Sequence, residues 1–375
     1  MKPLAPAIDA AQAIKREVWR TQLRARRGVA LVARRPPPQV ATTPKDEVWS
    51  FGKARLWRYR SSQVREGPPL VLMLGLVGDS AIFDLHPGNS WAQRLLDEGF
   101  DVFLFDWGAP EAAESDHALE TYLQGYLVPA LDAARRTAGA LSVSLGAYCM
   151  GSLMALLLLG SDPRLPVRNL VLFTPPCDFE HSPTFLGGYR DGRIAPADAI
   201  DETTGLVPAS AMRAMFRLLQ PTSDLVQYVT LWEHLWRDDY VESHRAVNHW
   251  AWNHRAMAGT AFLQLIHDYV QGNALVQGTA RLGNSPVDLA RITVPTLIVV
   301  AERDEFVPPA HSAPLEDMLG SEDLDVLRVP GGHAGALMGS VARRLTVPAV
   351  VDWLHRHSTP TESATPTRSS DADAR

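Results

Sequence analysis

Hydrophobic residues fall into short, dense runs that alternate with longer segments of helical spacing. Such runs are typical of strands that are buried on both faces of a sheet. Strands are predicted over residues 55–60, 70–77, 102–105, 141–145, 169–173, 294–300 and 325–329. Helices are predicted over residues 89–98, 119–138, 150–159, 312–319 and 347–355. The alternation indicates an α/β protein whose mostly parallel sheet is covered by helices on both faces.

The pattern changes between about residues 180 and 290, where strand-like runs stop and tryptophan and histidine become frequent. We interpret 180–290 as a helical cap inserted into a core made of residues 46–179 and 291–358. Residues 1–45 form an N-terminal arm, and its Pro/Arg-rich part, from residue 20 onward, is expected to be disordered or peripheral. The Ser/Thr/Pro/Asp-rich stretch 359–375 is expected to be a disordered tail.

Composition narrows the classes of function. The 375 residues carry a net charge of −6, and no extended basic face for nucleic acid follows the arm. No apolar run approaches the roughly 20 residues that cross a bilayer, and the start lacks the apolar stretch of a secretory signal. We therefore expect a cytoplasmic protein without a transmembrane segment. With only Cys149 and Cys177, neither a disulfide framework nor a cysteine-based zinc site is expected, and no metal is predicted.

Cys149 lies where a predicted strand meets a predicted helix, in the stretch LGAYCMG. The nucleophile of many hydrolases occupies the pattern G-x-S-x-G, a tight turn between strand and helix that small neighbours allow. Ala147 and Gly151 hold the two small positions, and Gly146 lies one place earlier than the pattern. A thiol at a helix N-terminus gains thiolate character, and a histidine would activate it further. The alternative is an ordinary buried core cysteine.

Two further residues complete a catalytic arrangement. Asp304 follows a predicted strand, and His333 lies in the glycine-rich turn PGGHAGA after the last strand. The order nucleophile, acid, histidine is that of α/β-hydrolases, so we predict that fold with an inserted helical cap. His333 would take the proton of Cys149, and Asp304 would fix the imidazole. The backbone N–H groups of Val77 and Met150 are the predicted oxyanion hole.

Six stretches, in this order along the chain, resemble the catalytic subunit of polyhydroxyalkanoate synthases: GFDVFLFDWGAPE, LETYLQGYL, LGAYCMGS, RNLVLFTPPCDF, RITVPTLIVVAERDEFVPP and PGGHAGALMGSVARRLTVPAVVDWL. The resemblance runs from about Trp57 to Leu354 and is strongest to the short class III type. It implies that Cys149 is the chain-carrying nucleophile, His333 its base and Asp304 the partner of that base. It also implies polymerisation of 3-hydroxyacyl-CoA, in a short-chain form such as 3-hydroxybutyryl-CoA, through an acyl-cysteine with release of CoA.

The same resemblance bears on cofactors and partners. It implies no cofactor, because the CoA thioester is itself the substrate. A second synthase subunit, a homo- or hetero-oligomer, and attachment to the surface of polymer granules are the partners it implies.

Three features depart from the family pattern. Ser152 stands where the family has a glycine, the loop GDSAIFDL (Gly78 to Leu85) replaces an Asn-Arg/Lys-Pro-Tyr-like run, and the tail has no counterpart. Two other functions therefore stay open. One is a cysteine-dependent thioesterase or ester hydrolase on the same scaffold, which would release free acid instead of polymer. The other is a non-catalytic binding protein associated with granules.

Overall fold

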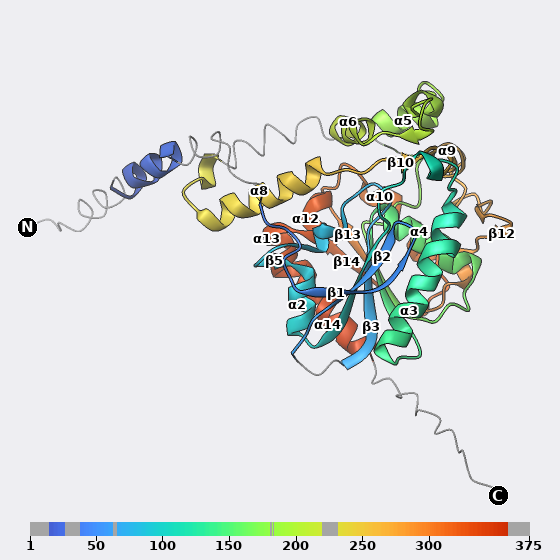
Figure 1. Ribbon diagram of the computed structural model, residues 1–375, viewed down its shortest axis with the longest axis horizontal. Helices are drawn as coiled ribbons and strands as arrows, with labels where there is room; N and C mark the ends of the chain where they lie inside the picture. The colour runs from blue at the N-terminus through green and yellow to red at the C-terminus, as the bar shows by residue number, and fades with distance from the viewer. Residues whose placement is uncertain are drawn as a thin grey trace, which may run out of the picture.

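An eight-stranded sheet runs through the centre of the molecule (Figure 1), and the computed structural model describes residues 15–26, 38–62, 66–180, 182, 184–219 and 232–358. The strand order is β1-β2-β6-β3-β7-β8-β13-β14. Only the pairs β1/β2 and β2/β6 are antiparallel in this sheet, which confirms the predicted fold class. The strands are β1 (Lys45–Phe51), β2 (Ala54–Tyr59), β3 (Glu66–Met73), β6 (Phe100–Asp106), β7 (Val143–Tyr148), β8 (Val167–Phe173), β13 (Thr296–Ala301) and β14 (Leu324–Val329).

Alternate residues of each strand face opposite layers of helices. In β3, Val71 and Met73 belong to one buried cluster, and Leu72 belongs to the other. Burial on both faces explains why the strands are continuous apolar runs in the sequence. The first cluster includes residues of α3 (Val128–Ala138) and α4 (Met150–Ser161), and the second includes residues of α2 (Trp91–Asp97) and α14 (Val347–His357).

The segment between β8 and β13 holds helices and two-residue strands, and Figure 1 shows α8 lying over one end of the core. Strands β9 and β10 pair antiparallel, so the part of the chain with α6 and α8 leaves and re-enters the fold at one place. The elements are α5 (Thr184–Arg190), β9 (Leu206–Val207), α6 (Ala209–Leu219), α8 (Asp238–Trp252), β10 (Met257–Ala258), α9 (Gly259–Gln264), η5 (Leu265–Gln271), β11 (Arg281–Leu282) and β12 (Ser285–Pro286).

Short elements complete the core. They are η1 (Ser80–Phe83), β4 (Asp84–His86), β5 (Asn89–Ser90), η2 (Ala112–Glu114), η3 (Thr121–Leu127), α10 (Pro309–Ser312), α11 (Leu315–Met318), α12 (His333–Leu337), α13 (Gly339–Val341) and η7 (Ala342–Thr346).

Several predicted boundaries were wrong. The strand predicted over 70–77 ends at Met73, because the next four residues form a loop whose apolar side chains are also buried. The helix predicted over 312–319 is two short helices, and Pro314 lies between them and lacks the N–H that a continuous helix needs. The bounds of the helix predicted over 119–138 are confirmed, and within it η3 is a π-helical stretch that precedes Pro129, the second residue of α3.

The N-terminal arm is partly helical. Residues 15–26 form a helix, so of the two alternatives predicted for the part from residue 20 onward, disordered or peripheral, disorder is wrong for residues 20–26. Its Arg20 guanidinium lies 4.5 Å from the centre of the Trp236 ring in the cap. The predicted disordered tail, 359–375, lies outside the described residues. Within the described part of the chain, no helix has both the length and the apolarity to span a membrane.

Candidate active site

Cys149 occupies a strained turn between β7 and α4. Its backbone has φ 56° and ψ −121°, outside the regions that L-residues normally adopt, which costs about 1–3 kcal/mol. The turn also needs glycines, because a Cβ at Gly151 would lie 2.9 Å from the carbonyl carbon of Leu74. A Cβ at Gly146, within β7, would lie 2.9 Å from a methyl carbon of Leu72, so a side chain there would require Leu72 to shift.

Ser152 holds the turn closed from the helix side. Its hydroxyl donates to the carbonyl of Ala147 at 2.7 Å, and the Cys149 amide donates to the carbonyl of Phe173 at 2.9 Å. The serine that departs from the family pattern therefore supplies a hydrogen bond across the turn, which a glycine there could not make.

His333 and Asp304 meet beside this turn. Asp304 follows β13, and His333 is the first residue of α12, after β14. The imidazole Nδ1 lies 2.7 Å from Asp304 Oδ2, and both side chains are buried. The other carboxylate oxygen accepts the amides of Phe306 (2.8 Å) and Val307 (2.9 Å), so the carboxylate cannot rotate without losing these bonds.

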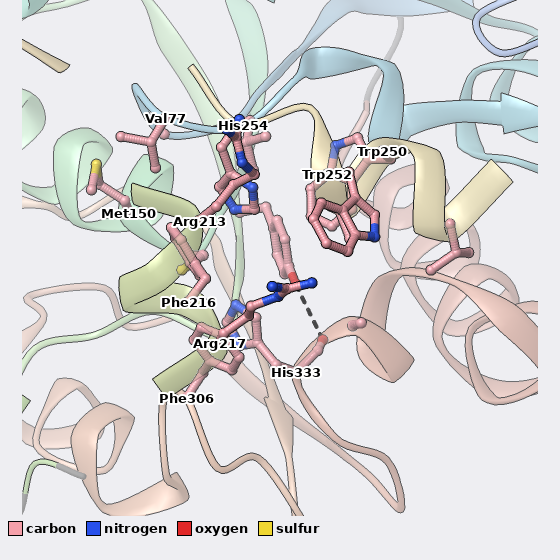
Figure 2. Close-up of a pocket in the computed structure, with 18 residues that line it drawn as sticks. Val77, Met150, Arg213, Phe216, Arg217, Trp250, Trp252, His254, Phe306 and His333 are labelled. Atoms are coloured by element: carbon pink, nitrogen blue, oxygen red, sulfur yellow. Dashed lines mark hydrogen bonds between the residues drawn. The ribbon is translucent and has the colours of Figure 1, made fainter. Parts of the chain in front are cut away.

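Two aromatic rings lie beside the imidazole. The ring of Tyr148 lies 5.0 Å from the His333 ring, and the ring of Phe306 lies 5.1 Å from it with an interplanar angle of 22°. The Tyr148 hydroxyl also donates to the His333 carbonyl at 3.3 Å, drawn as the dashed line in Figure 2. Neither Tyr148 nor Phe306 was predicted as a site residue, although they lie one residue from Cys149 and two residues from Asp304.

The charges of the three predicted residues are coupled. Burial lowers the pKa of His333, but the charges of Cys149 and Asp304, and the side-chain hydrogen bonds to both, outweigh burial and raise this pKa to about 10. The imidazole is therefore protonated near neutral pH while the sulfur beside it is unmodified. The structure thus brings Cys149, His333 and Asp304 together.

A cavity of about 240 Å³ opens onto Cys149 between the core and the cap. From the core, its lining includes Leu74, Gly75, Val77, Cys149, Met150 and His333. From the cap, it includes Arg213, Phe216, Arg217, Trp250, Trp252 and His254, and Figure 2 shows these side chains around the cavity. Cap residues therefore form one wall of the space in front of the thiol.

The loop after β3 is fixed by donors from distant parts of the chain. Three of its carbonyls accept hydrogen bonds: Leu74 from Trp107 Nε1 (2.7 Å), Val77 from the Arg255 amide (2.9 Å) and Asp79 from Trp250 Nε1 (2.7 Å). Bonded carbonyls fix the peptide planes between them, and hence the directions of the N–H groups. The unusual loop sequence is thus held from the cap and from the end of β6.

Arg255 of the cap also contacts the core through its guanidinium. It forms a two-armed ion pair with Asp106, with Nη2 2.9 Å from Oδ2, and the Ser80 hydroxyl donates to the same carboxylate at 2.6 Å. Burial raises the pKa of Asp106, but the bonds from Arg255, Ser80 and the Gly108 amide outweigh it, so this pKa is lowered. No local pattern predicts a pair of residues that are 149 positions apart in the chain.

The two residues predicted for the oxyanion hole both line the cavity. Met150 is the first residue of α4, where an amide has no partner within the helix. Val77 lies in the loop described above. Their assignment as oxyanion donors stays a prediction.

The sheet order and the strained elbow define an α/β-hydrolase fold. In solved structures, a membrane phospholipase A described as a bacterial virulence factor is similar in fold, with a TM-score of 0.50 and 16% identity over 95% of this chain and 99% of that chain. No family model matches the sequence.

Relatives in sequence identify the family. The poly(3-hydroxyalkanoate) polymerase subunit PhaC of Allochromatium vinosum is 32% identical over 82% of this chain and 87% of its own length. PhaC of a Synechocystis species is 31% identical over 84% of this chain and 85% of its own length. PhaC of Haloferax mediterranei is 32% identical over 85% of this chain, which spans 65% of that relative. The chain belongs to the family of poly(3-hydroxyalkanoate) polymerase subunits PhaC.

Proposed function

We propose that the chain joins 3-hydroxyacyl units supplied as CoA thioesters, with Cys149 carrying the growing polymer and CoA leaving. One observation carries the proposal: Cys149, at a strained turn, lines the same cavity as His333 and helps to raise the pKa of that imidazole, and Asp304 Oδ2 lies 2.7 Å from Nδ1 of the ring. Membership of the polymerase family supports the same chemistry. A short-chain substrate such as 3-hydroxybutyryl-CoA is part of the proposal.

The first step loads the cysteine. The Cys149 thiolate attacks the thioester carbonyl carbon, and the oxyanion that forms would lie against the amides of Met150 and Val77. The carbon–sulfur bond to CoA then breaks, and the His333 imidazolium gives its proton to the departing CoA thiolate. Because acyl-cysteine is also a thioester, acyl groups move between the two sulfurs with little change in free energy.

The second step forms the ester. Acylation removes the negative charge of Cys149, and this charge is one cause of the raised pKa of His333. Its loss lowers the pKa of His333 and favours the neutral imidazole that remains after the proton has passed to CoA. This imidazole takes the hydroxyl proton of a second 3-hydroxyacyl-CoA, and the oxygen attacks the acyl-Cys149 carbonyl. The bond to sulfur breaks, Cys149 leaves as a thiolate, and the thiolate–imidazolium pair is restored. The chain is one unit longer and ends in a CoA thioester.

Water is the competing acceptor, and the cap reduces its access. Phe216, Trp250 and Phe306 give the cavity aromatic walls on the sides of both cap and core. An apolar wall disfavours a free water beside the acyl-cysteine more than it disfavours a hydroxyl that is tethered to a bound substrate. This difference would favour polymerisation over hydrolysis.

Product analysis tests the proposal. The purified chain is incubated with 3-hydroxybutyryl-CoA, CoA release is followed by thiol titration, and the products are separated into polymer and free acid. Polymer in proportion to CoA supports a synthase. Free 3-hydroxybutyrate in proportion to CoA would show that the chain is a thioesterase and not a synthase. If no CoA is released, a non-catalytic binding role at granules is the remaining alternative.

A second subunit is a separate part of the proposal. The cavity is closed on one side by the cap, so a partner that favours an open cap would speed both entry of CoA thioester and exit of polymer. The expected result is a lag in CoA release from the chain alone, shortened by the candidate subunit. If CoA release shows no lag and its rate does not change when the subunit is added, the proposal of a second subunit fails.

A further inference from the structure

Two arginines of α6 reach into the cavity that contains Cys149. Arg213 and Arg217 are four residues apart, so they share one face of the helix. Arg213 is half-buried and Arg217 is exposed, which places the pair along the path from the cavity to solvent. Figure 2 shows both side chains directed inward from the cap.

Neither arginine has a carboxylate partner among the residues that the structure describes. The contrast with other cap arginines is clear, because Arg190 and Arg193 both pair with Asp191, at 2.8 and 3.1 Å. Instead, the Arg217 guanidinium lies 4.0 Å from the centre of the Trp252 ring, and that tryptophan is 55% exposed. Stacking on an aromatic ring leaves the guanidinium donors free for an anion.

The size of the cavity limits which part of the substrate the arginines can meet. The cavity measures about 240 Å³, whereas pockets that enclose drug-sized ligands measure roughly 300–1,000 Å³. A CoA thioester is larger than a drug-sized ligand, so the cavity cannot enclose all of it. With the acyl group at Cys149, the nucleotide end must lie outside the cavity. The arginines and Trp252 line the way out.

We propose that Arg213 and Arg217 bind phosphate groups of the CoA thioester, with Trp252 supporting Arg217. The inference rests on the proposed function. Phosphates are the only anionic groups of a 3-hydroxyacyl-CoA, and guanidinium groups bind phosphate with paired, charge-assisted hydrogen bonds. The polyester product is neutral along its length, so the pair would hold the donor and free CoA without holding the polymer.

The test compares two donors that differ only in phosphate. 3-Hydroxybutyryl-CoA and 3-hydroxybutyryl-pantetheine are given to the wild type and to the double variant Arg213→Gln/Arg217→Gln. For the CoA donor, KM should rise roughly tenfold to a hundredfold in the variant, with kcat little changed. For the pantetheine donor, kcat/KM should be the same in both proteins. The wild-type KM for CoA donor should also rise with salt, and less so in the variant.

A matched control removes two positive charges elsewhere in the cap. Arg190→Gln/Arg193→Gln should leave KM for both donors unchanged, because these side chains pair with Asp191. An equal loss with both donors in the Arg213/Arg217 variant would mean that the arginines only support the cap, and no loss with either would also overturn the proposal.

Direct binding separates this inference from the proposed function. Titration calorimetry with free CoA needs no turnover. If the wild type polymerises neither donor but binds CoA, and the double variant binds it at least tenfold more weakly, the phosphate site stands and the synthase proposal fails. If the wild type turns over thioesters but the two proteins bind CoA equally, the phosphate site fails and the synthase proposal stands.

Discussion

The core and the cap differ in how they treat charged side chains at the cavity. In the core, Asp304 and His333 are buried and bonded to each other, and the carboxylate is held by two further amides. In the cap, Arg213 and Arg217 have no carboxylate partner among the described residues, and one stacks on an exposed tryptophan. Bond making needs groups fixed to within fractions of an ångström, whereas holding a long anionic substrate needs charge that solvent and ligand can reach. The difference fits the two proposals made above, that the core pair serves the chemistry and the cap arginines serve substrate binding.

Removing the core nucleophile should have the largest effect. We expect Cys149→Ala to lower CoA release by about 10⁴-fold or more, because in the proposed mechanism Cys149 carries the acyl chain. Cys177 supplies the control: it is 1% exposed, and burial, together with Asp178, raises the pKa of its thiol to about 12. Cys177→Ala should keep turnover within a factor of about two. Stopped-time CoA release checks both, and wild-type turnover by Cys149→Ala would end the assignment.

The next effect concerns activation of the thiol and its pH dependence. Because the folded pKa of His333 is about 10, the imidazolium persists until pH approaches that value, so alkylation by iodoacetamide should be nearly constant between pH 7 and 9. In His333→Gln, alkylation at pH 7 should be roughly thirtyfold slower and should rise with pH, as for an ordinary thiol of pKa about 8.5.

Both proteins are measured in a Cys177→Ala background, so that mass spectrometry reports a single thiol. Equal alkylation rates in the two proteins across this pH range would show that His333 does not activate Cys149.

The smallest expected effect comes from a variant of Arg255, which tests whether a contact between the cap and the core contributes to kcat. Arg255→Gln removes the ion pair to Asp106, and the loop that carries Val77 should lose its fixed direction. We expect kcat to fall about tenfold with KM nearly unchanged, and stability to fall by about 1–3 kcal/mol. Arg255→Lys should restore part of both, since it keeps the charge.

A double variant, Arg255→Gln with Asp106→Asn, separates the loss of kcat from the loss of stability. The double variant should recover stability, because no unpaired carboxylate remains, but not kcat. Recovery of both would mean that Arg255 only supports the fold.

Much of the core could be predicted because its strands are short apolar runs between helical segments. Where apolar character did not coincide with strand structure, the prediction failed: Leu74, Leu76 and Val77 are buried as deeply as strand residues, yet they belong to a loop. The strand β1 was missed for the opposite reason, since it lies at the sheet edge with most of its residues partly or fully exposed.

The candidate site shows the same limit. Cys149, Asp304 and His333 could be proposed because each lies in a local pattern that matches a known order. The pair of Arg255 and Asp106 has no such pattern, because the two residues are 149 positions apart and only the fold brings them together. Contacts between the cap and the core depend on tertiary packing, which periodicity does not encode.

The bond between His333 and Asp304 has a consequence for the order of events. Nδ1 is bonded to Asp304, and a flip of the imidazole would break this bond, so Nε2 is the nitrogen left to exchange protons in the cavity. In the proposed mechanism, the departing CoA thiolate and the arriving hydroxyl both exchange a proton with that same nitrogen. The two half-reactions of that mechanism would therefore follow one another, and CoA that stays at the site would act as a competitive inhibitor of the next hydroxyl. Addition of each 3-hydroxyacyl unit would then require prior release of CoA from the site.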